Sequence, residues 1–295
     1  MNPTGTSEAV EYQATPQRLF LGEGPLWHPG WQELLVVDVP RGDIHRFDSG
    51  LRLKGTIATG RPTSAVTWQE DGSIICFHDR GEISRVGHRQ ATPESVLTIS
   101  DESGGMFNDV IADPRGRILC GALPVGSRPG RLYSIEPDRS YRILLDDLLE
   151  PNGMGFASDG GVLYFADSVG QTIWRMPYDP ASGATGPRTV FWRTAGDELP
   201  DGLTVDAEDQ VVCAIWNGGC VVRLTPAGEL IGRVKLSAKR VTSVAFGGAE
   251  LDAVYATSAL QDGPDGAGDE SAGAVFRMTG TGRRGRPEWP SRLAV

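Results

Sequence analysis

The chain of 295 residues has only four cysteines and no C-x-x-C spacing, which argues against a zinc-finger or disulfide-scaffold protein. Three of the four occupy the same place in similar apolar segments, SIICF, RILCG and QVVCA. We therefore expect small buried side chains in equivalent strands, with thiols that suit a reducing, cytoplasmic location. The four cysteines are Cys76, Cys120, Cys213 and Cys220.

Long apolar runs and basic stretches are also missing. The chain has no run of 18 apolar residues, so no transmembrane helix is expected. The N-terminus lacks the basic start and apolar core of a signal peptide. The net charge is −10 without a Lys/Arg stripe, which disfavours nucleic acid as a partner. The segment 280–295 is locally basic but short, and we expect a flexible tail there. Neither a nucleic acid nor a membrane is an expected partner.

A repeated pattern is the main positive feature of the sequence. Six segments begin at intervals of roughly 40 to 50 residues, which is typical of propeller blades. Each has a short apolar strand, a turn such as QEDGS or SDGGV, a β-branched or aromatic strand, a loop and a third strand, and helical periodicity is absent. The segments begin at Gly24, Ser64, Asn108, Asn152, Asp201 and Thr242.

This pattern predicts an all-β fold, a six-bladed β-propeller with four-stranded blades around a central channel. Residues 1–295 form a single domain in this interpretation. Residues 1–22 are expected to close the ring, with EYQATPQRLFLG adding an outer strand to the last blade and covering its edge.

The residues at the heads of the repeats all carry a side-chain oxygen. Because the first strand of a propeller blade lines the channel, we expect side chains just before these strands to converge on the axis. Converging oxygens, two of them carboxylates, suit a hard divalent cation. Glu23 favours this interpretation, since glutamate is not a turn former and is costly to bury unpaired. The heads are Glu23, Ser64, Asn108, Asn152, Asp201 and Ser243.

Two of these heads have a second interpretation. Asn152-Gly153 and Asp201-Gly202 are also common turn pairs. The spacing of the repeats leaves a turn role and a ligand role both open at these positions.

Five motifs occur in order at blade spacing from Glu23 to about Met278: GEGPLW, FNDVIADPRGR, PNGMGFASDGGVLYFADS, PDGLTVDAEDQVVCAIWNGG and VTSVAFGG. In these motifs the chain resembles the senescence-marker-protein/gluconolactonase family, which includes regucalcin. The resemblance implies a six-bladed propeller with one catalytic divalent metal ion on its axis, whether Ca, Zn, Mn or Mg. It also implies that Glu23, Asn152 and Asp201 are the metal ligands and that Asn108 contacts the substrate or a metal-bound water. Members of the family hydrolyse sugar lactones, and some hydrolyse other lactones or organophosphates.

The chain differs from the sugar lactonases of this family in two places. Met106 stands where those members carry an arginine, and the loop GALPVGSRPGR lacks the acidic residue that some members have. We expect Met106 and Asn108, two residues apart in an extended segment, to face the same channel mouth. Arg128, or alternatively Arg61, is expected to supply a replacement cation. The substrate is then a lactone or ester less polar than a sugar lactone.

The predicted function is that of a metal-dependent carboxylic-ester hydrolase of lactonase type, in which the metal polarises the carbonyl and activates water. Asp201 is expected to be both ligand and general base, with Glu23 as the alternative base. No G-x-S-x-G elbow occurs, and of the four histidines only His78 is expected near the channel mouth; the others are His28, His45 and His88.

Two other classes of protein stay open. One is an enzyme of the same architecture with non-hydrolytic chemistry, as in the similar strictosidine-synthase-like propellers of specialised metabolism. The other is a non-catalytic calcium-binding protein. The expected partner is a small-molecule lactone or ester, and the expected assembly is a monomer or a weak homo-oligomer.

Overall fold

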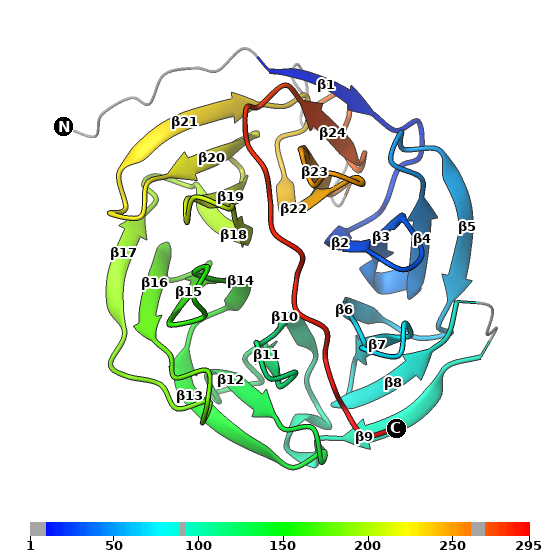
Figure 1. Ribbon diagram of the computed structural model, residues 1–295, viewed down its shortest axis with the longest axis vertical. Coiled ribbons are helices and arrows are strands. Elements are labelled where there is room, and N and C mark those ends of the chain that lie inside the picture. Colours follow the sequence, from blue (N-terminus) through cyan, green and yellow to red (C-terminus); the bar gives the residue numbers. More distant parts are fainter. Residues whose placement is uncertain (1–9, 89–91, 261–268) are drawn as a thin grey trace.

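The computed structural model describes residues 10–88, 92–260 and 269–295. Within them, 24 strands form six four-stranded antiparallel sheets arranged around a central axis (Figure 1). The predicted six-bladed β-propeller is thereby confirmed. The described residues include two short 3-10 turns, η1 (Val39–Arg41) and η2 (Ser100–Glu102), and no helix in them is long and apolar enough to cross a bilayer.

Each blade is built outward from the axis in chain order. The inner strands are β2 (Gly22–His28), β6 (Thr63–Trp68), β10 (Phe107–Ala112), β14 (Pro151–Phe156), β18 (Leu199–Val205) and β22 (Val241–Gly247). The second strands are β3 (Glu33–Asp38), β7 (Ile74–His78), β11 (Ile118–Ala122), β15 (Val162–Asp167), β19 (Val211–Trp216) and β23 (Ala253–Ser258).

The outer half of each blade follows the same order. The third strands are β4 (Asp43–Phe47), β8 (Glu82–Val86), β12 (Gly130–Ile135), β16 (Thr172–Pro177), β20 (Cys220–Leu224) and β24 (Phe276–Thr279). The outermost strands are β5 (Leu53–Ala58), β9 (Glu94–Thr98), β13 (Tyr141–Leu148), β17 (Thr189–Arg193), β21 (Leu230–Lys235) and β1 (Glu11–Ala14). Blades 1 to 6 are named here after inner strands β2, β6, β10, β14, β18 and β22.

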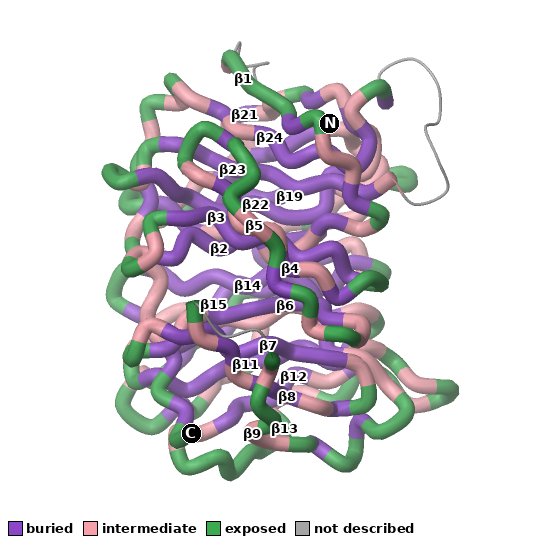
Figure 2. Tube along the Cα trace, turned by 90° about the vertical axis from the view of Figure 1, so that its right-hand side faces the viewer, coloured by how far each residue is buried: buried purple, intermediate pink, exposed green. Residues whose placement is uncertain are grey.

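The second strands form the apolar centre of each blade. Every residue of β3, β7, β11 and β23 is buried, because the neighbouring blades cover both faces of each sheet. β-branched residues such as those of β7 and β19 favour this pleated, buried setting. Cys76, Cys120 and Cys213 lie in β7, β11 and β19 with no exposed surface, so their predicted equivalence is confirmed. Figure 2 shows buried residues along the strands and exposed ones mainly at the turns.

The ring closes in blade 6, where the two ends of the propeller sequence share one sheet. Strand β1 pairs with β24 in an antiparallel register from Glu11 opposite Thr279 to Ala14 opposite Phe276. The inner strands β22 and β2 also lie against each other, which completes the circle around the axis. Residues 1–9 of the segment expected to close the ring lie outside the described residues.

The C-terminal segment 280–295, expected to be a flexible tail, instead lies across one face of the ring (Figure 1). The side chain of Gln69 holds it by three hydrogen bonds. Its Nε2 donates to the carbonyl of Leu293 at 2.5 Å, and its Oε1 accepts from the Ser291 hydroxyl at 2.7 Å and from the backbone N–H of Leu293 at 3.1 Å. Buried backbone groups of an extended segment need such partners. We call residues 280–295 the C-terminal strap.

Candidate functional site

The pairing of each inner strand with its second strand is interrupted near the start of the inner strand. A β-bulge of this kind adds a residue to one strand and re-aims its side chains. The heads of the repeats therefore lie within the inner strands at these bulges, not in the loops ahead of them as the sequence predicted. The interruptions fall between Glu23 and Leu26, Thr63 and Ala65, Phe107 and Val110, Pro151 and Met154, Pro200 and Leu203, and Val241 and Val244.

The glycines after two of the heads serve the contact between blades. A Cβ on Gly153 would overlap the backbone of Leu203 and lie 2.6 Å from the carbonyl oxygen of Asp201. A Cβ on Gly202 would overlap the side chain of Ser243. Asn152-Gly153 and Asp201-Gly202 thus lie in β14 and β18 and are not turns, which settles that alternative. Glycine is needed where neighbouring inner strands approach this closely.

Four of the predicted residues line one cavity of about 350 Å³ at the starts of the inner strands. They are Glu23, Asn108, Asn152 and Asp201, and they come from four different blades. The sequence therefore identified four polar residues of the cavity by their place at the repeat heads; the heads Ser64 and Ser243 are not among its described lining residues. The other lining residues are Leu21, Leu123, Glu150, Ser168, Leu199 and Trp216.

The acidic groups of the cavity are strongly perturbed by burial. Burial raises the pKa of Asp201 well above its usual range, and repulsion from Glu23 and Glu150 raises it further. Burial, followed by repulsion from Asp109, likewise raises the pKa of Glu23. Asp201 is only 5% exposed, and its Oδ1 has no hydrogen-bond partner. A buried carboxylate beside a second, partly buried one is stabilised by a proton or by a cation.

A hydrogen-bond chain links the second and third candidate ligands. The Asn152 amide donates from Nδ2 to the hydroxyl of Ser168 at 3.1 Å, and Ser168 donates to the carbonyl of Pro200 at 2.7 Å. Asn152 Oδ1 accepts from the backbone of Gly153 at 3.0 Å. Because the Ser168 proton is directed at Pro200, its oxygen is left to accept from Asn152. Pro200, which precedes Asp201 in β18, thereby fixes the orientation of the Asn152 amide in β14 through Ser168.

An aspartate at the end of the second strand anchors the approach to the inner strand in two blades. In blade 1, Asp38 accepts hydrogen bonds from the backbone of Phe20 and Leu21 at 3.2 and 3.3 Å. In blade 4, Asp167 accepts one from the backbone of Glu150 at 2.7 Å. Charged acceptors make strong hydrogen bonds to backbone N–H groups. Leu21 and Glu150 consequently reach the cavity from equivalent positions.

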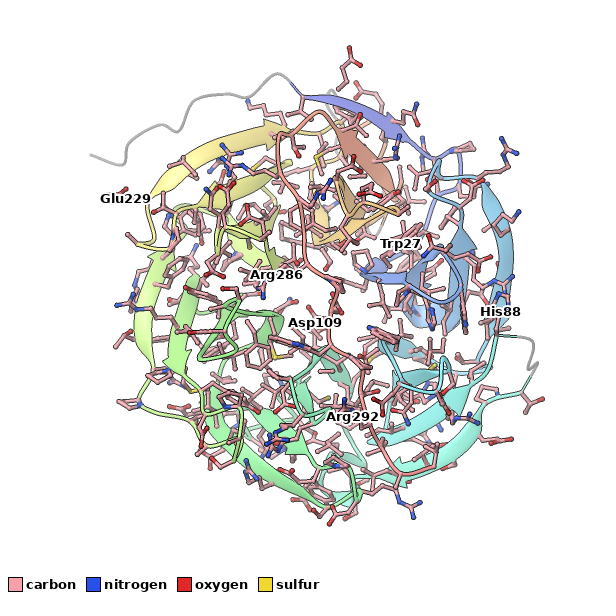
Figure 3. All side chains as sticks on the ribbon, viewed as in Figure 1. Trp27, His88, Asp109, Glu229, Arg286 and Arg292 are labelled. Atoms are coloured by element: carbon pink, nitrogen blue, oxygen red, sulfur yellow. The ribbon has the colours of Figure 1, made fainter. Side chains whose placement is uncertain are left out.

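Two more carboxylates lie on the axis toward the other face of the ring. Burial raises the pKa of Asp109 to about 6 and that of Glu288, with repulsion from Asp109, to about 7. Figure 3 shows Asp109 near the centre of the ring. Glu288 belongs to the C-terminal strap, which bonds to residues at the ends of the inner strands, such as Trp68. The strap and the cavity therefore lie on opposite faces.

Met106 and Arg128 are not among the residues that line the cavity, which differs from the prediction. Met106 is partly buried against a hydrophobic cluster that includes Leu26 and Cys76. Asn108 lies in the bulge of β10, so the alternation of an extended strand does not carry from Met106 to Asn108. Arg128 donates to the buried carboxylate of Glu102 at 2.5 Å.

Arg61 and His78 also have their interaction partners outside the cavity. Arg61 is ion-paired with Asp79 and Glu82. His78 is 1% exposed and bonds to Thr63 and Ser84, and burial lowers its pKa to about 4. His78 is thus a packed polar residue of blade 2, not a group at the channel mouth. No lysine, arginine or histidine is among the lining residues of the cavity that the structure describes.

The donor set fits a hard divalent cation. Glu23, Asn152 and Asp201 present carboxylate and amide oxygens, the ligand types that Ca²⁺, Mg²⁺ and Mn²⁺ prefer. The unpartnered Oδ1 of Asp201 and the raised pKa values of both carboxylates fit a site that a cation would stabilise. In the described part of the chain, no three His, Cys, Asp or Glu side chains form a metal-holding group, and the predicted ligand set includes the amide of Asn152.

The sequence did not single out three further lining residues, Glu150, Ser168 and Trp216. Each lies in or next to a motif that was recognised: Glu150 precedes PNG, Ser168 is the last residue of PNGMGFASDGGVLYFADS, and Trp216 lies within PDGLTVDAEDQVVCAIWNGG. Comparing the repeats position by position around the heads would have marked Glu150, because Leu21 and Leu199 stand two residues before Glu23 and Asp201.

Comparison with known proteins places this cavity in a family context. A family model described as SMP-30/Gluconolactonase/LRE-like region matches residues 21–260. A pentonolactonase, XacC, of Haloferax volcanii is 40% identical over 280 residues, covering 92% of this chain and 94% of that protein. Regucalcin of Homo sapiens is 29% identical over 282 residues, covering 92% and 94%.

Solved structures agree with this match over almost the whole chain. A luciferin-regenerating enzyme has a TM-score of 0.86 at 25% identity, covering 97% of this chain and 100% of that one. A regucalcin from Agrobacterium tumefaciens, described as a calcium-binding protein, has a TM-score of 0.87 at 26% identity, covering 94% and 95%. The chain belongs to the SMP-30/gluconolactonase/LRE-like family.

Proposed function

We propose that this protein is a lactone hydrolase that uses one divalent metal ion held by Glu23, Asn152 and Asp201. The observation that carries the proposal is the meeting of these three side chains, from three blades, in one cavity with an unpartnered Asp201 oxygen. The 40% identity to a pentonolactonase over 92% of the chain supports lactone hydrolysis as the reaction.

A divalent cation in such a site supplies Lewis acidity, which polarises an ester carbonyl and makes a water molecule more acidic. Asp201 is the proposed general base, because it lines the cavity and its buried Oδ1 has no hydrogen-bond partner. It takes a proton from the attacking water, the oxygen of which adds to the lactone carbonyl carbon. The ring C–O bond then breaks and the ring oxygen receives a proton. Glu23 is the alternative base, and Asn108 is proposed to orient the substrate.

The cavity walls bear on the polarity of the substrate. Three leucines and a tryptophan line the cavity, and its described lining contains no cationic side chain. In the sequence, Met106 was the basis for expecting a preference for lactones less polar than gluconolactone. These apolar walls support the same preference without Met106. An apolar wall without donors discriminates poorly in favour of a heavily hydroxylated ligand. A cytoplasmic location stays a prediction, based on four buried, unpaired cysteines.

The test is a lactone panel assayed with chelator-stripped protein and after addition of Mn²⁺, Zn²⁺, Ca²⁺ or Mg²⁺. We expect turnover only with metal. Asp201→Ala should abolish turnover and lower the metal affinity by at least about tenfold, since one of two anionic ligands is lost. Glu229→Ala removes an exposed carboxylate at the periphery of the ring and is the matched control (Figure 3).

Three outcomes would contradict the proposal. Full turnover and metal content in Asp201→Ala would exclude this ligand set. Tight calcium binding without turnover of any lactone would favour a non-catalytic calcium-binding protein; the similar Agrobacterium regucalcin is described as a calcium-binding protein. Metal-dependent turnover of a panel member into a product other than the ring-opened acid would favour non-hydrolytic chemistry.

A further inference from the structure

Three blades present the residue two positions before the head of the repeat to the cavity. These residues are Leu21 before Glu23, Glu150 before Asn152 and Leu199 before Asp201. The first two are held alike, because the backbone N–H of each donates to the aspartate that ends the second strand of its blade. One position in the repeat thus forms part of the cavity wall in blades 1, 4 and 5.

Glu150 is the one charged member of this trio. Its backbone is fixed by Asp167 at 2.7 Å, whereas no described side chain donates a hydrogen bond to its carboxylate. A partly buried carboxylate without a donor is costly, and leucine at the equivalent positions shows that the fold does not require an acid there. The carboxylate is therefore available to a ligand.

We propose that Glu150 selects the substrate by accepting a hydrogen bond from a hydroxyl group on the lactone ring. This inference rests on the proposed lactone hydrolysis. An ionised carboxylate is an acceptor only, so its natural complement is an O–H donor. Leu21, Leu199 and Trp216 contact the less polar edges of the same ring. The substrate class is then a small lactone with a hydroxyl on one side and apolar edges on the others.

Trp216 is positioned for this second contact. The Arg240 guanidinium lies 5.9 Å from the centre of the Trp216 ring, while Trp216 also lines the cavity. A cation near one face holds the indole in place. The indole then offers a fixed apolar surface in the same cavity as the Glu150 carboxylate, which suits a ligand of mixed polarity.

The experiment compares α-hydroxy-γ-butyrolactone with γ-butyrolactone, which lacks the hydroxyl. The wild-type protein should show kcat/KM at least about tenfold higher for the hydroxylated lactone, since a hydrogen bond to a charged group discriminates strongly. Glu150→Leu copies the residue of the equivalent blades and should bring this ratio close to one. Glu150→Gln keeps an acceptor oxygen and should give an intermediate ratio. Glu229→Leu, at the exposed periphery, should leave the wild-type ratio unchanged.

Two further measurements separate selection from other roles of Glu150. Binding of Mn²⁺ to stripped Glu150→Leu should match the wild type, whereas a loss as large as that in Asp201→Ala would make Glu150 a metal ligand and overturn the proposal. The ammonium analogue, homoserine lactone, should gain at least as much from Glu150 as the hydroxylated lactone, because a carboxylate accepts charge-assisted hydrogen bonds from an ammonium group. A gain for neither analogue over γ-butyrolactone would also overturn the proposal.

Failure of the proposed hydrolysis can be told apart from failure of this inference. If the wild type hydrolyses neither lactone, hydrolysis of this substrate class fails. Ligand-observed NMR with the same two lactones then decides the role of Glu150 by binding alone. Preference for the hydroxylated lactone in the wild type and its loss in Glu150→Leu support the inference, and equal binding in both proteins overturns it.

Discussion

At the scale of single residues, the cavity depends on a few side chains whose orientation is fixed by their hydrogen-bond partners. The Asn152 amide has two ends that differ chemically, and only its oxygen suits a cation. The Ser168 hydroxyl selects the orientation, because its proton is directed at the Pro200 carbonyl, 2.7 Å away. Ser168 is thus a positioning residue that also ties blade 4 to the residue preceding Asp201.

Ser168→Ala is expected to lower metal affinity by roughly 10- to 100-fold, the usual effect of removing a group that orients a ligand. The Asn152 amide would lose its acceptor at Nδ2 and could rotate. Calorimetric titration of stripped protein with Mn²⁺ measures this. Ser134→Ala removes another fully buried serine, in β12, and should leave the affinity unchanged. Equal affinities in all three proteins would show that Ser168 only fills space.

At the scale of elements, each inner strand combines a bulge with a close approach to its neighbour. The bulge re-aims the head toward the cavity, and glycine after the head in β14 and β18 lets the next strand come close. The sequence pairs Asn-Gly and Asp-Gly therefore arise from packing between blades, although the same pairs favour turns in other contexts. An Asn-Gly or Asp-Gly pair can form a turn or lie within a strand, and here packing against the neighbouring strand favours the strand.

Gly153→Ala is expected to lower the free energy of unfolding by roughly 1 to 3 kcal/mol, the range for overpacking a tight site. The added Cβ would overlap the backbone of Leu203, which cannot move without disturbing β18. Urea unfolding measures the change. Gly104→Ala is the control, since its Cβ would meet nothing closer than 3.7 Å. A Gly153→Ala midpoint equal to that of the control would contradict the close approach.

At the scale of the whole molecule, the ring is held at both ends of the chain. Strand β1 completes the sheet of blade 6, and the C-terminal strap crosses the face opposite the cavity. The strap brings Glu288 onto the axis near Asp109, where burial raises the pKa of Glu288 to about 7. Both carboxylates therefore make the stability of the metal-free ring depend on pH.

The sign of this effect follows from the raised pKa. Glu288 binds its proton more tightly in the folded state than in the unfolded state, where its pKa is near 4.5. Its contribution to stability is fully present below about pH 4.5 and is lost as pH rises through about 7. Above that pH the folded protein carries the cost of a partly buried charge.

Glu288→Gln should therefore be more stable than the wild type at pH 8, by up to about 3 kcal/mol, and about equal to it at pH 4.5. Because Glu288 is partly exposed, solvent will reduce the difference below that upper value. Urea unfolding of stripped protein at the two pH values measures it, with Glu229→Gln as the exposed control. If the difference in free energy of unfolding between wild type and Glu288→Gln does not change with pH, the Glu288 carboxylate is solvated and the prediction is wrong.

Much of the fold and part of the site were accessible from sequence because they depend on local patterns. Turn residues between β-branched segments give the blades, and their period gives the number of blades. The burial of Cys76 and its two equivalents follows from the same alignment of repeats. Once six repeats surround one axis, their heads are expected to converge, and four of the six line the described cavity: Glu23, Asn108, Asn152 and Asp201. The choice of Glu23, Asn152 and Asp201 as the ligands came from the family resemblance. Their role as metal ligands stays a prediction.

The sequence by itself thus determined the propeller and the oxygen-bearing heads, since both arise from repetition along the chain. Only the tertiary structure decided which other side chains reach the cavity, where Glu150, Ser168 and Trp216 are included and Met106 and Arg128 are not. The physical reason is that bulges break the alternation of side chains and that partners in other segments hold the loops. The path of the C-terminal strap was decided in the same way, because its hydrogen bonds are made to blades far from it in sequence.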